Sequence, residues 1–332
     1  MKVIRASIIG FGSVGQGVAQ VLLQKKEEIQ KKGFDLKVVA VADSRSAAID
    51  EKGLDLEKVL KSKKENGRVG SETLSGLEVI RNVEHEVVIE TTPTDIETGG
   101  VGLDNMLTAF EKGMDVVTSN KGPLALKYGE LAETAQKNNA KFRFEATVGG
   151  AMPAINLIRD TIAGNSIISI EGILNGTCNY ILTRMMEEHA SYEQMLAESQ
   201  ELGIAETDPT YDVEGIDAAC KLVILANYVF GMKATYHDVD VKGITSITPE
   251  ALSLAQSEGY VIKQIGEVKD GCIQTSPRLV PESHPLAVGG TLNVVSVQTD
   301  LAGTVTSTGR GAGSIETASA ILSDLISIYR ED

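Results

Sequence analysis

Hydrophobic and polar positions along the first half of the chain predict strands that alternate with helices. Residues 3–9 are rich in β-branched side chains and predict a buried strand. A helical stretch follows at 14–33, and a second strand at 36–43 ends in Asp43. Further strands are expected at 85–95, at 113–126 and from residue 141, with an inserted helix and loop at 46–77. This alternation favours a doubly wound α/β domain.

The second half has a different pattern, which predicts a mixed α+β domain. Residues 220–232 are mostly apolar and indicate a helix that enters a core, with Lys221 near its start. Residues 276–313 alternate like strands separated by turns. Residues 316–330 have helical periodicity, and we expect this last helix to pack back on the first domain.

Composition and charge narrow the class of protein. The chain has 332 residues, enough for two domains, and a formal charge of −15, which disfavours nucleic acid and anionic membranes as partners. Cys178, Cys220 and Cys272 show neither zinc spacing nor a disulfide framework. The start shows no signal peptide, and no apolar run approaches the roughly 20 residues that span a bilayer. We therefore expect a cytoplasmic protein.

A glycine motif directly follows the first strand. In GFGSVG, Gly10 permits a tight turn, Gly12 lets a pyrophosphate approach the backbone, and Gly15 allows close packing of helix and strand. The helix that follows offers free N–H groups to phosphates. The motif therefore predicts a dinucleotide site, whose lining residues are expected to be Gly10, Phe11, Gly12, Ser13, Val14 and Gly15.

Two residues near the end of the second strand give conflicting signals about the coenzyme. Asp43 is placed to bind ribose hydroxyls, which favours NAD. Arg45, next to Ser44, could bind a 2′-phosphate, which favours NADP. The sequence therefore leaves the choice between NAD and NADP open. The lysine-rich stretches 24–32 and 61–68 are interpreted as solvated surface.

Polar residues also follow the third and fourth expected strands. Thr92 and Pro93 follow one, and Ser119 and Lys121 follow the other. The carboxyl ends of parallel strands form the ligand-binding edge of such a sheet. Lys121 at this edge is therefore a candidate functional residue.

An acidic segment precedes Lys221. It contains Glu206, Asp208, Asp212, Glu214 and Asp217, and Asp217 lies four residues before Lys221 on the expected helix. Carboxylates of this kind could hold a substrate ammonium group while an amine transfers a proton. A solvated acidic loop is the alternative.

Several segments in this order resemble the homoserine dehydrogenase family over essentially the full length. They are GFGSVG, VTSNKGPLA, FEATVGGAMP, EGILNGTCNYIL, GIAETDPTYDVEGIDAACK and GRGAGSIETASAILSDL. The resemblance implies reversible, NAD(P)-dependent oxidation of L-homoserine to L-aspartate 4-semialdehyde in threonine, methionine and isoleucine biosynthesis. It also implies a homodimer formed through the second domain.

The resemblance also implies roles for individual residues. Lys221 is the expected proton donor and acceptor, with Lys121 a second candidate, and the residues leave the choice open. Substrate binding is expected at Glu206, Asp217, Asp212, Gly176 and Thr177. Coenzyme contacts are expected also at Gly203, Gly311 and Gly313. A sodium ion is expected at Glu145, Val148, Gly150 and Met152.

Domain bounds follow from the same comparison of segments. We expect an NAD(P)-binding Rossmann domain at 1–147, a catalytic and dimerisation domain at 148–308, and a returning C-terminal segment at 309–332. Longer family members carry a regulatory domain of roughly 80 residues, for which this chain leaves no room. We therefore expect no threonine feedback through such a domain.

Two other functions fit parts of the sequence. A semialdehyde dehydrogenase would use Cys178 as a thiolate nucleophile, although no histidine stands at a telling spacing. A redox sensor that only binds NAD(H) would need no acidic pocket. Near Cys178, Thr177 and Asn179 either cap the helix that starts there or contact a ligand.

Overall fold

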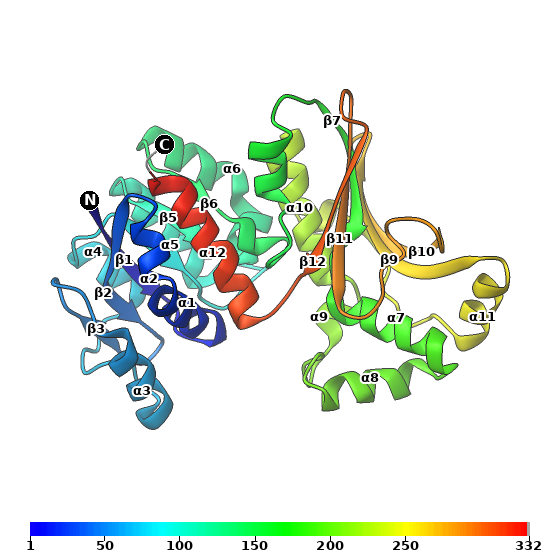
Figure 1. Cartoon of the computed structure of the whole chain (residues 1–332), viewed down its shortest axis with the longest axis horizontal. Coiled ribbons are helices and arrows are strands. Elements are labelled where there is room, and N and C mark those ends of the chain that lie inside the picture. Colours follow the sequence, from blue (N-terminus) through cyan, green and yellow to red (C-terminus); the bar gives the residue numbers. More distant parts are fainter. Residues whose placement is uncertain (331–332) are drawn as a thin grey trace. The chain divides into compact units, whose positions relative to one another are not determined.

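Two sheets organise the chain, and each belongs to a separate unit of the computed structural model, which describes residues 1–330. Unit 1 comprises residues 1–150 together with the chain from Gly313 onward, and unit 2 comprises Ala151–Ala312. Figure 1 labels the elements of both units. No helix among residues 1–330 is long and apolar enough to cross a membrane.

The sheet of unit 1 has six strands in the order β3-β2-β1-β4-β5-β6. Five of them run parallel, and β3 pairs antiparallel with β2 at one edge. The bounds are β1 Lys2–Ile9, β2 Phe34–Ala42, β3 Ala47–Ile49, β4 Val87–Glu90, β5 Asp115–Thr118 and β6 Phe142–Arg143. This parallel order confirms the expected doubly wound fold and brings the ends of β1, β2, β4 and β5 to one edge.

Helices cover this sheet. They are α1 Ser13–Gln24, α2 Lys26–Gln30, α3 Leu56–Asn66, α4 Gly76–Asn82, α5 Gly100–Glu111, α6 Lys121–Lys137 and α12 Ser314–Tyr329, with a short 3-10 turn at Glu145–Thr147. The single helix expected at 14–33 is broken at Lys25, where ψ is 14°. The strands expected at 85–95 and 113–126 are only four residues long, because β4 and β5 give way to turns and α6.

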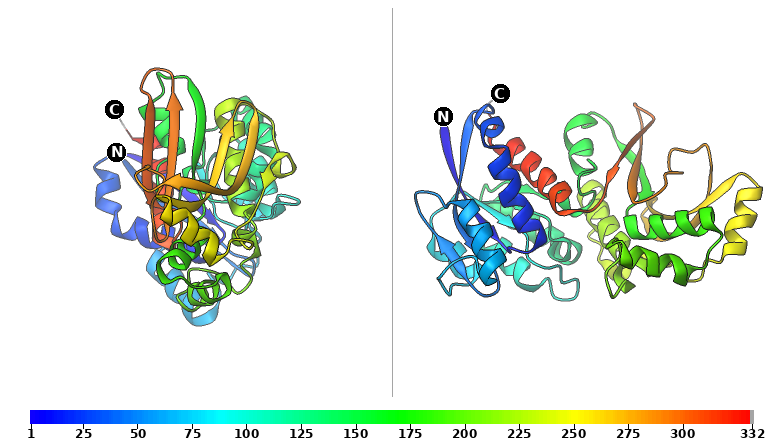
Figure 2. Two further views of the ribbon diagram at one scale, coloured as in Figure 1. Left: turned by 90° about the vertical axis from the view of Figure 1, so that its right-hand side faces the viewer. Right: turned by 60° about the horizontal axis from the view of Figure 1, so that its bottom comes forward.

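The last helix belongs to unit 1, as the sequence predicts. Figure 2 shows α12 beside α1, and a Cβ at Gly17 would lie 2.3 Å from the hydroxyl oxygen of Ser314. The Ser314 hydroxyl also donates to the carbonyl of Ser13 at 2.6 Å. Asp324, fully buried on α12, accepts the backbone N–H of Glu145 at 2.9 Å. Unit 1 is thus completed by the far end of the chain.

Unit 2 has a second six-stranded sheet in the order β12-β11-β7-β9-β10-β8. Neighbouring strands are antiparallel except β8 and β10. The bounds are β7 Ile167–Ile173, β8 Asp240–Val241, β9 Tyr260–Lys269, β10 Cys272–Pro281, β11 Leu292–Thr299 and β12 Thr304–Arg310. The strands predicted at 276–313 therefore extend this sheet.

Helices of unit 2 pack on both faces of β9. The helices are α7 Gly176–Glu188, α8 Tyr192–Glu201, α9 Thr210–Val213, α10 Ile216–Phe230 and α11 Pro249–Ser257, with a π-helical turn at Leu157–Thr161 and a 3-10 turn at Tyr236–Asp238. Lys263 of β9 bonds to α7, whereas a Cβ at Gly266 would meet Leu222 of α10 at 2.9 Å. Residues an odd number apart on a strand face opposite sides, so α7 and α10 lie on opposite faces.

Candidate active site

The glycine loop after β1 has the geometry of a phosphate-binding turn. Gly10 has a φ of 94°, and a Cβ there would lie 2.5 Å from the backbone of Thr91. A Cβ at Gly15 would lie 2.1 Å from the carbonyl oxygen of Gly10. Gly12 differs, because no atom beyond its chain neighbours lies within 4 Å of a Cβ placed there. The loop is therefore tight at both ends and open in the middle.

The start of α1 fits the pyrophosphate of a dinucleotide. Gly12 is the N-cap of this helix, and no side chain caps it. The first N–H groups of a helix have no partner within the helix and carry a partial positive charge. With open space above Gly12, an anion can reach these groups directly. The residues present thus fit a dinucleotide coenzyme.

Asp43, at the end of β2, is held by several groups. Its Oδ2 accepts a hydrogen bond from the ammonium of Lys63 at 2.7 Å. Its Oδ1 accepts hydrogen bonds from the backbone N–H groups of Arg45 and Ser46 at 2.8 and 2.7 Å. These interactions outweigh burial and lower the pKa of Asp43. Lys63 is only 23% exposed, so the interpretation of 61–68 as solvated surface is wrong at this residue. The Arg45 side chain is exposed.

The last residue of β4, Glu90, is a buried acid that sequence analysis missed. Glu90 is fully buried, and burial raises the pKa of its carboxyl group. Its Oε1 accepts the hydroxyl and the backbone N–H of Thr92, and Asn120 donates to the Thr92 hydroxyl at 3.1 Å. Asn120 is also the N-cap of α6, so Lys121 is the first residue of that helix. This network fixes the turns that carry Thr92 and Lys121.

Lys221 is buried in unit 2 and held by two acceptors. Its Nζ lies 2.6 Å from Oδ2 of Asp217, one helical turn earlier on α10, and 2.6 Å from the carbonyl oxygen of Leu174. The i, i+4 pair expected from the sequence is therefore present. These two bonds use two of the three hydrogens of the ammonium and leave one for a ligand oxygen.

Asn175 joins the carboxylates, and sequence analysis gave it no role in the site. Its Nδ2 donates to Asp212 at 2.7 Å and to Asp217 at 3.0 Å. Its Oδ1 accepts the N–H of Cys178, which makes it the N-cap of α7. Burial and the charge of Asp217 raise the pKa of Asp212. The side-chain amide of Asn175 thus donates to two carboxylates and caps the start of α7.

The remaining acids of the 203–221 segment lie at the surface. Glu206, Asp208 and Glu214 are exposed, as is Gly203 after the end of α8. Gly176 and Thr177 form the first turn of α7, beside Asn175. The segment therefore divides into an inner part, with Asp217 buried and Asp212 half-buried, and an exposed outer part. The alternative interpretation, a solvated acidic loop, is wrong for Asp217, which is buried.

Cys178 is unsuited to act as a nucleophile. It is fully buried, its Sγ donates to the carbonyl oxygen of Asp212 at 3.1 Å, and burial raises the pKa of its thiol. A nucleophilic cysteine needs a lowered pKa. Thr177 and Asn179 do not cap α7, because Asn175 does so.

The expected cation ligands lie on either side of the change from unit 1 to unit 2. Glu145 is 3% exposed, and Val148 and Met152 are fully buried. Gly150 has a φ of 56°, which favours glycine. Among residues 1–330 no cluster of three or more acidic, histidine or cysteine side chains could hold a metal. A site at these residues would depend on one carboxylate and on backbone carbonyls.

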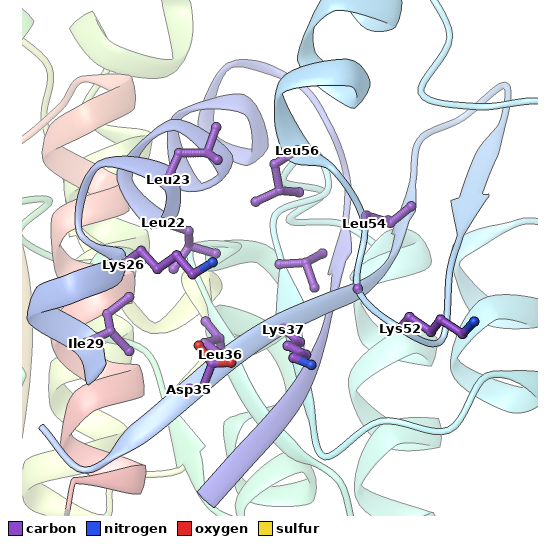
Figure 3. A pocket seen from close by; sticks show the side chains of 12 residues that line it. Leu22, Leu23, Lys26, Ile29, Asp35, Leu36, Lys37, Lys52, Leu54 and Leu56 are labelled. Carbon is purple, nitrogen blue, oxygen red and sulfur yellow. The ribbon is translucent and has the colours of Figure 1, made fainter. Parts of the chain in front are cut away.

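A separate hollow of about 200 Å³ lies on the other half of β2 (Figure 3). Its lining is mostly aliphatic, with Lys26, Lys37 and Lys52 among the charged side chains. The strand residues that line it, 35–38, precede the end of β2 that carries Asp43. The hollow is therefore distinct from the coenzyme-binding edge.

Comparison with known proteins covers both units. The family model for homoserine dehydrogenase matches residues 153–326, and the model for the homoserine dehydrogenase NAD binding domain matches residues 10–145. A homoserine dehydrogenase of Methanocaldococcus jannaschii is 55% identical over 327 residues, 97% of each chain.

Solved structures agree with these matches. A homoserine dehydrogenase from Thiobacillus denitrificans superposes with a TM-score of 0.87 at 34% identity, covering 99% of this chain and 73% of that one. A hyperthermophilic archaeal homoserine dehydrogenase in complex with NADPH gives a TM-score of 0.85 at 28% identity, covering 98% and 97%.

Proposed function

This chain belongs to the homoserine dehydrogenase family, and from that premise we propose which of its residues carry out the reaction. The enzyme is an NAD(P)-dependent oxidoreductase that interconverts L-homoserine and L-aspartate 4-semialdehyde. Oxidation removes a hydride from the alcohol carbon and a proton from the alcohol oxygen. The nicotinamide coenzyme supplies the hydride chemistry, so the protein must orient the substrate and handle the proton.

We propose that Lys221 transfers this proton. Its Nζ is anchored by Asp217 and by the Leu174 carbonyl, which leaves one hydrogen for the substrate oxygen. In the direction of aldehyde reduction the ammonium donates a proton and stabilises the developing alkoxide. In oxidation the amine accepts the proton, directly or through water. Lys121 in unit 1 remains the second candidate.

Substrate binding is proposed at the carboxylates around Asn175. Asp217 and the exposed Glu206 would hold the ammonium group of homoserine, and Asp212 would support the loop. The first turn of α7, at Gly176 and Thr177, would offer N–H groups to the carboxylate of the substrate. The carboxylates would thus meet the ammonium group of a zwitterionic amino acid, and the N–H groups would meet its carboxylate.

For the coenzyme we propose a preference for NADP. Asp43 already accepts Lys63 and two backbone N–H groups, which weakens it as a partner for ribose hydroxyls. Lys63 and the exposed Arg45 add two positive charges to the same turn. Their charge suits a 2′-phosphate. Other coenzyme contacts are proposed at Gly10–Gly15, Ser44, Thr92, Pro93, Ser119, Lys121, Gly203, Gly311 and Gly313.

The remaining proposals concern the assembly. Unit 1 would supply most of the coenzyme contacts, and unit 2 would bind the substrate. A sodium ion would bind Glu145 and the carbonyls of Val148, Gly150 and Met152. A homodimer would form through the sheet of unit 2, where Ile168 and Leu279 on strands are 49% and 61% exposed. Light scattering on the purified cytoplasmic protein would report twice the chain mass.

The assay that tests the catalytic proposal compares wild type, Lys221→Ala and the exposed control Lys242→Ala. Each is given L-homoserine with NAD+ and with NADP+. We expect kcat to fall by about 100-fold or more in Lys221→Ala only, which fits loss of a general acid/base. Wild-type kcat in Lys221→Ala would transfer the role to Lys121. A KM for NADP+ that is lower than the KM for NAD+ in wild type would support the coenzyme proposal. In Lys63→Ala this difference between the two coenzymes should disappear.

A further inference from the structure

Unit 2 contains a buried lysine that the proposed mechanism does not use. Lys263 on β9 is 2% exposed, and its Nζ donates to Oδ1 of Asn179 at 2.8 Å and to the Thr183 hydroxyl at 2.9 Å. Both acceptors are neutral, and burial lowers the pKa of this amine to about 8. An aliphatic side chain of similar length would fill the site without desolvating an amine. Its retention therefore calls for a function that packing alone does not supply.

The two acceptors of Lys263 lie on successive turns of α7 and are themselves bonded. The Thr183 hydroxyl donates to the carbonyl of Asn179 at 2.7 Å. The Asn179 Nδ2 donates to the carbonyl of Leu292, at the start of β11, at 2.9 Å. One side-chain amide thus connects α7 to β9 through its oxygen and to β11 through its nitrogen. Such a bond pair fixes how far α7 is rotated and advanced along the sheet, because hydrogen bonds are directional.

Asn175 and Asn179 are four residues apart, so they lie on one face of α7 and about 6 Å apart along its axis. Asn175 makes the bonds of 2.7 and 3.0 Å to Asp212 and Asp217. A small rotation or slide of α7 would break these bonds. The remaining contacts of α7 are largely aliphatic and include Ile181, Leu182 and Met185, which tolerate such a slide better than hydrogen bonds do.

We propose that Lys263 is a positioning residue that, through Asn179, holds the start of α7 where Asn175 can align the substrate-binding carboxylates. The inference rests on the proposed function, because it assumes that Asp212 and Asp217 serve the substrate. It predicts an effect on homoserine binding that is separate from any effect on coenzyme binding, since the glycine loop belongs to unit 1.

The test replaces Lys263 with Met, which keeps the aliphatic stem and removes the amine. The matched control is Lys269→Met, on the same face of β9 but exposed. We expect Lys263→Met to raise KM for L-homoserine about 10-fold, the size of effect typical for a misplaced binding group, with kcat changed less. The dissociation constant for NADPH should stay within about 2-fold, and Lys269→Met should match wild type. Loss of folded enzyme alone would lower kcat without changing KM.

A double-mutant cycle distinguishes the proposed route from a general loosening of the unit. Asn179→Leu alone should raise KM for homoserine as Lys263→Met does, and the two together should raise it hardly further, because both cut one connection. Additive increases, or a wild-type KM in Lys263→Met, would overturn the proposal. If Lys263→Met does not fold, Asn179→Leu alone still cuts the proposed connection, and a KM increase is still required. Wild-type turnover tests the proposed function independently.

Discussion

At the residue scale, the site of unit 2 depends on Asn175, which has a full set of partners. Its amide nitrogen supplies one hydrogen to each of two carboxylates, and its oxygen caps α7. A carboxylate in its place could still cap the helix, because Asp is as good an N-cap as Asn. It could not donate to Asp212 or Asp217.

Asn175→Asp therefore isolates the donor function. Three carboxylates would share a buried site, and their repulsion should displace Asp217 from Lys221. We expect kcat/KM for homoserine to fall about 100-fold, equivalent to roughly 3 kcal/mol of transition-state stabilisation. Steady-state kinetics measure this, with Asn175→Ser as the milder comparison. A kcat/KM equal to that of wild type would show that the bridge is dispensable.

His85 should make the stability of unit 1 depend on pH in the acidic range. Its Nδ1 bonds the carbonyl of Val83 at 2.8 Å and its Nε2 bonds the Ser7 hydroxyl at 3.0 Å, and burial lowers the pKa of the ring to about 4. An unfolded histidine titrates near 6.5, so the unfolded chain binds more protons between pH 6.5 and 4. The free energy of unfolding should therefore fall as the pH falls through this window, by up to about 3 kcal/mol.

Urea unfolding of wild type and His85→Gln at pH 7.5 and 4.5 checks this. Carboxylates with lowered pKa values, such as Glu86, also lose stability in acid, so the comparison between the two proteins is what counts. The variant should lose less stability than wild type over this range. An equal loss in both would mean that His85 does not carry the effect.

The residues that sequence analysis found and missed differ in a physical way. Lys221 and Asp217 were predicted as a pair because helical spacing alone brings them together. Lys63 and Asp43 are twenty residues apart in the sequence and meet only because α3 returns to the end of β2. Asn175 was missed because Asp212 and Asp217, the acids that it joins, come from another segment. Contacts set by tertiary packing leave no local pattern.

At the element scale, the three glycines after β1 separate two effects of substitution. A Cβ at Gly15 would collide with the Gly10 carbonyl, whereas a Cβ at Gly12 would meet no protein atom within 4 Å. Gly15→Ala should therefore lower the stability of unit 1, by about 1–3 kcal/mol as for an overpacked site. Gly12→Ala should leave stability unchanged and weaken NADPH binding about 10-fold, since the methyl lies where phosphate approaches.

Thermal unfolding and fluorescence titration with NADPH measure both quantities for each variant. Each variant serves as the control for the other, because they differ by three positions in one loop. Reduced stability in Gly12→Ala would indicate that the loop is closed there rather than open.

Element types were easier to predict than element ends. The alternation of strands and helices in unit 1 follows from hydrophobic periodicity and is confirmed, but the short strand β3 lies where only a helix and loop were expected, and α4 and α5 were not predicted. The helix expected at 14–33 ends early, because its periodic pattern does not register the break at Lys25. The strand expected from 113 to 126 ends at Thr118, because the Asn120 cap already begins α6. Backbone caps decided these ends.

At the scale of the whole molecule, unit 1 depends on a helix that follows unit 2 in the chain. Ile321 of α12 is fully buried in the core of unit 1, whereas Ile315 on the same helix is 44% exposed. Ile321→Ala should lower the free energy of unfolding of unit 1 by about 2–5 kcal/mol, the usual range for such a cavity. Ile315→Ala should change it by less than about 0.5 kcal/mol.

Urea unfolding followed with and without NADPH tests this, because a coenzyme bound to the folded unit should restore part of the lost stability. Equal destabilisation by the two substitutions would argue against the packing of α12 on α1. The comparison also tests the assignment of coenzyme binding to unit 1.

Because unit 1 is formed from two separate parts of the chain, it cannot finish folding early during synthesis on the ribosome. Its β1–α1 segment emerges first, yet the apolar surface that α12 covers stays open until the whole of unit 2 has been synthesised. At roughly 5–20 residues per second, the interval of about 300 residues between α1 and α12 lasts on the order of fifteen to sixty seconds. Nascent chains would therefore carry a finished substrate unit before a finished coenzyme unit, and chaperones would meet them at the exposed face of α1.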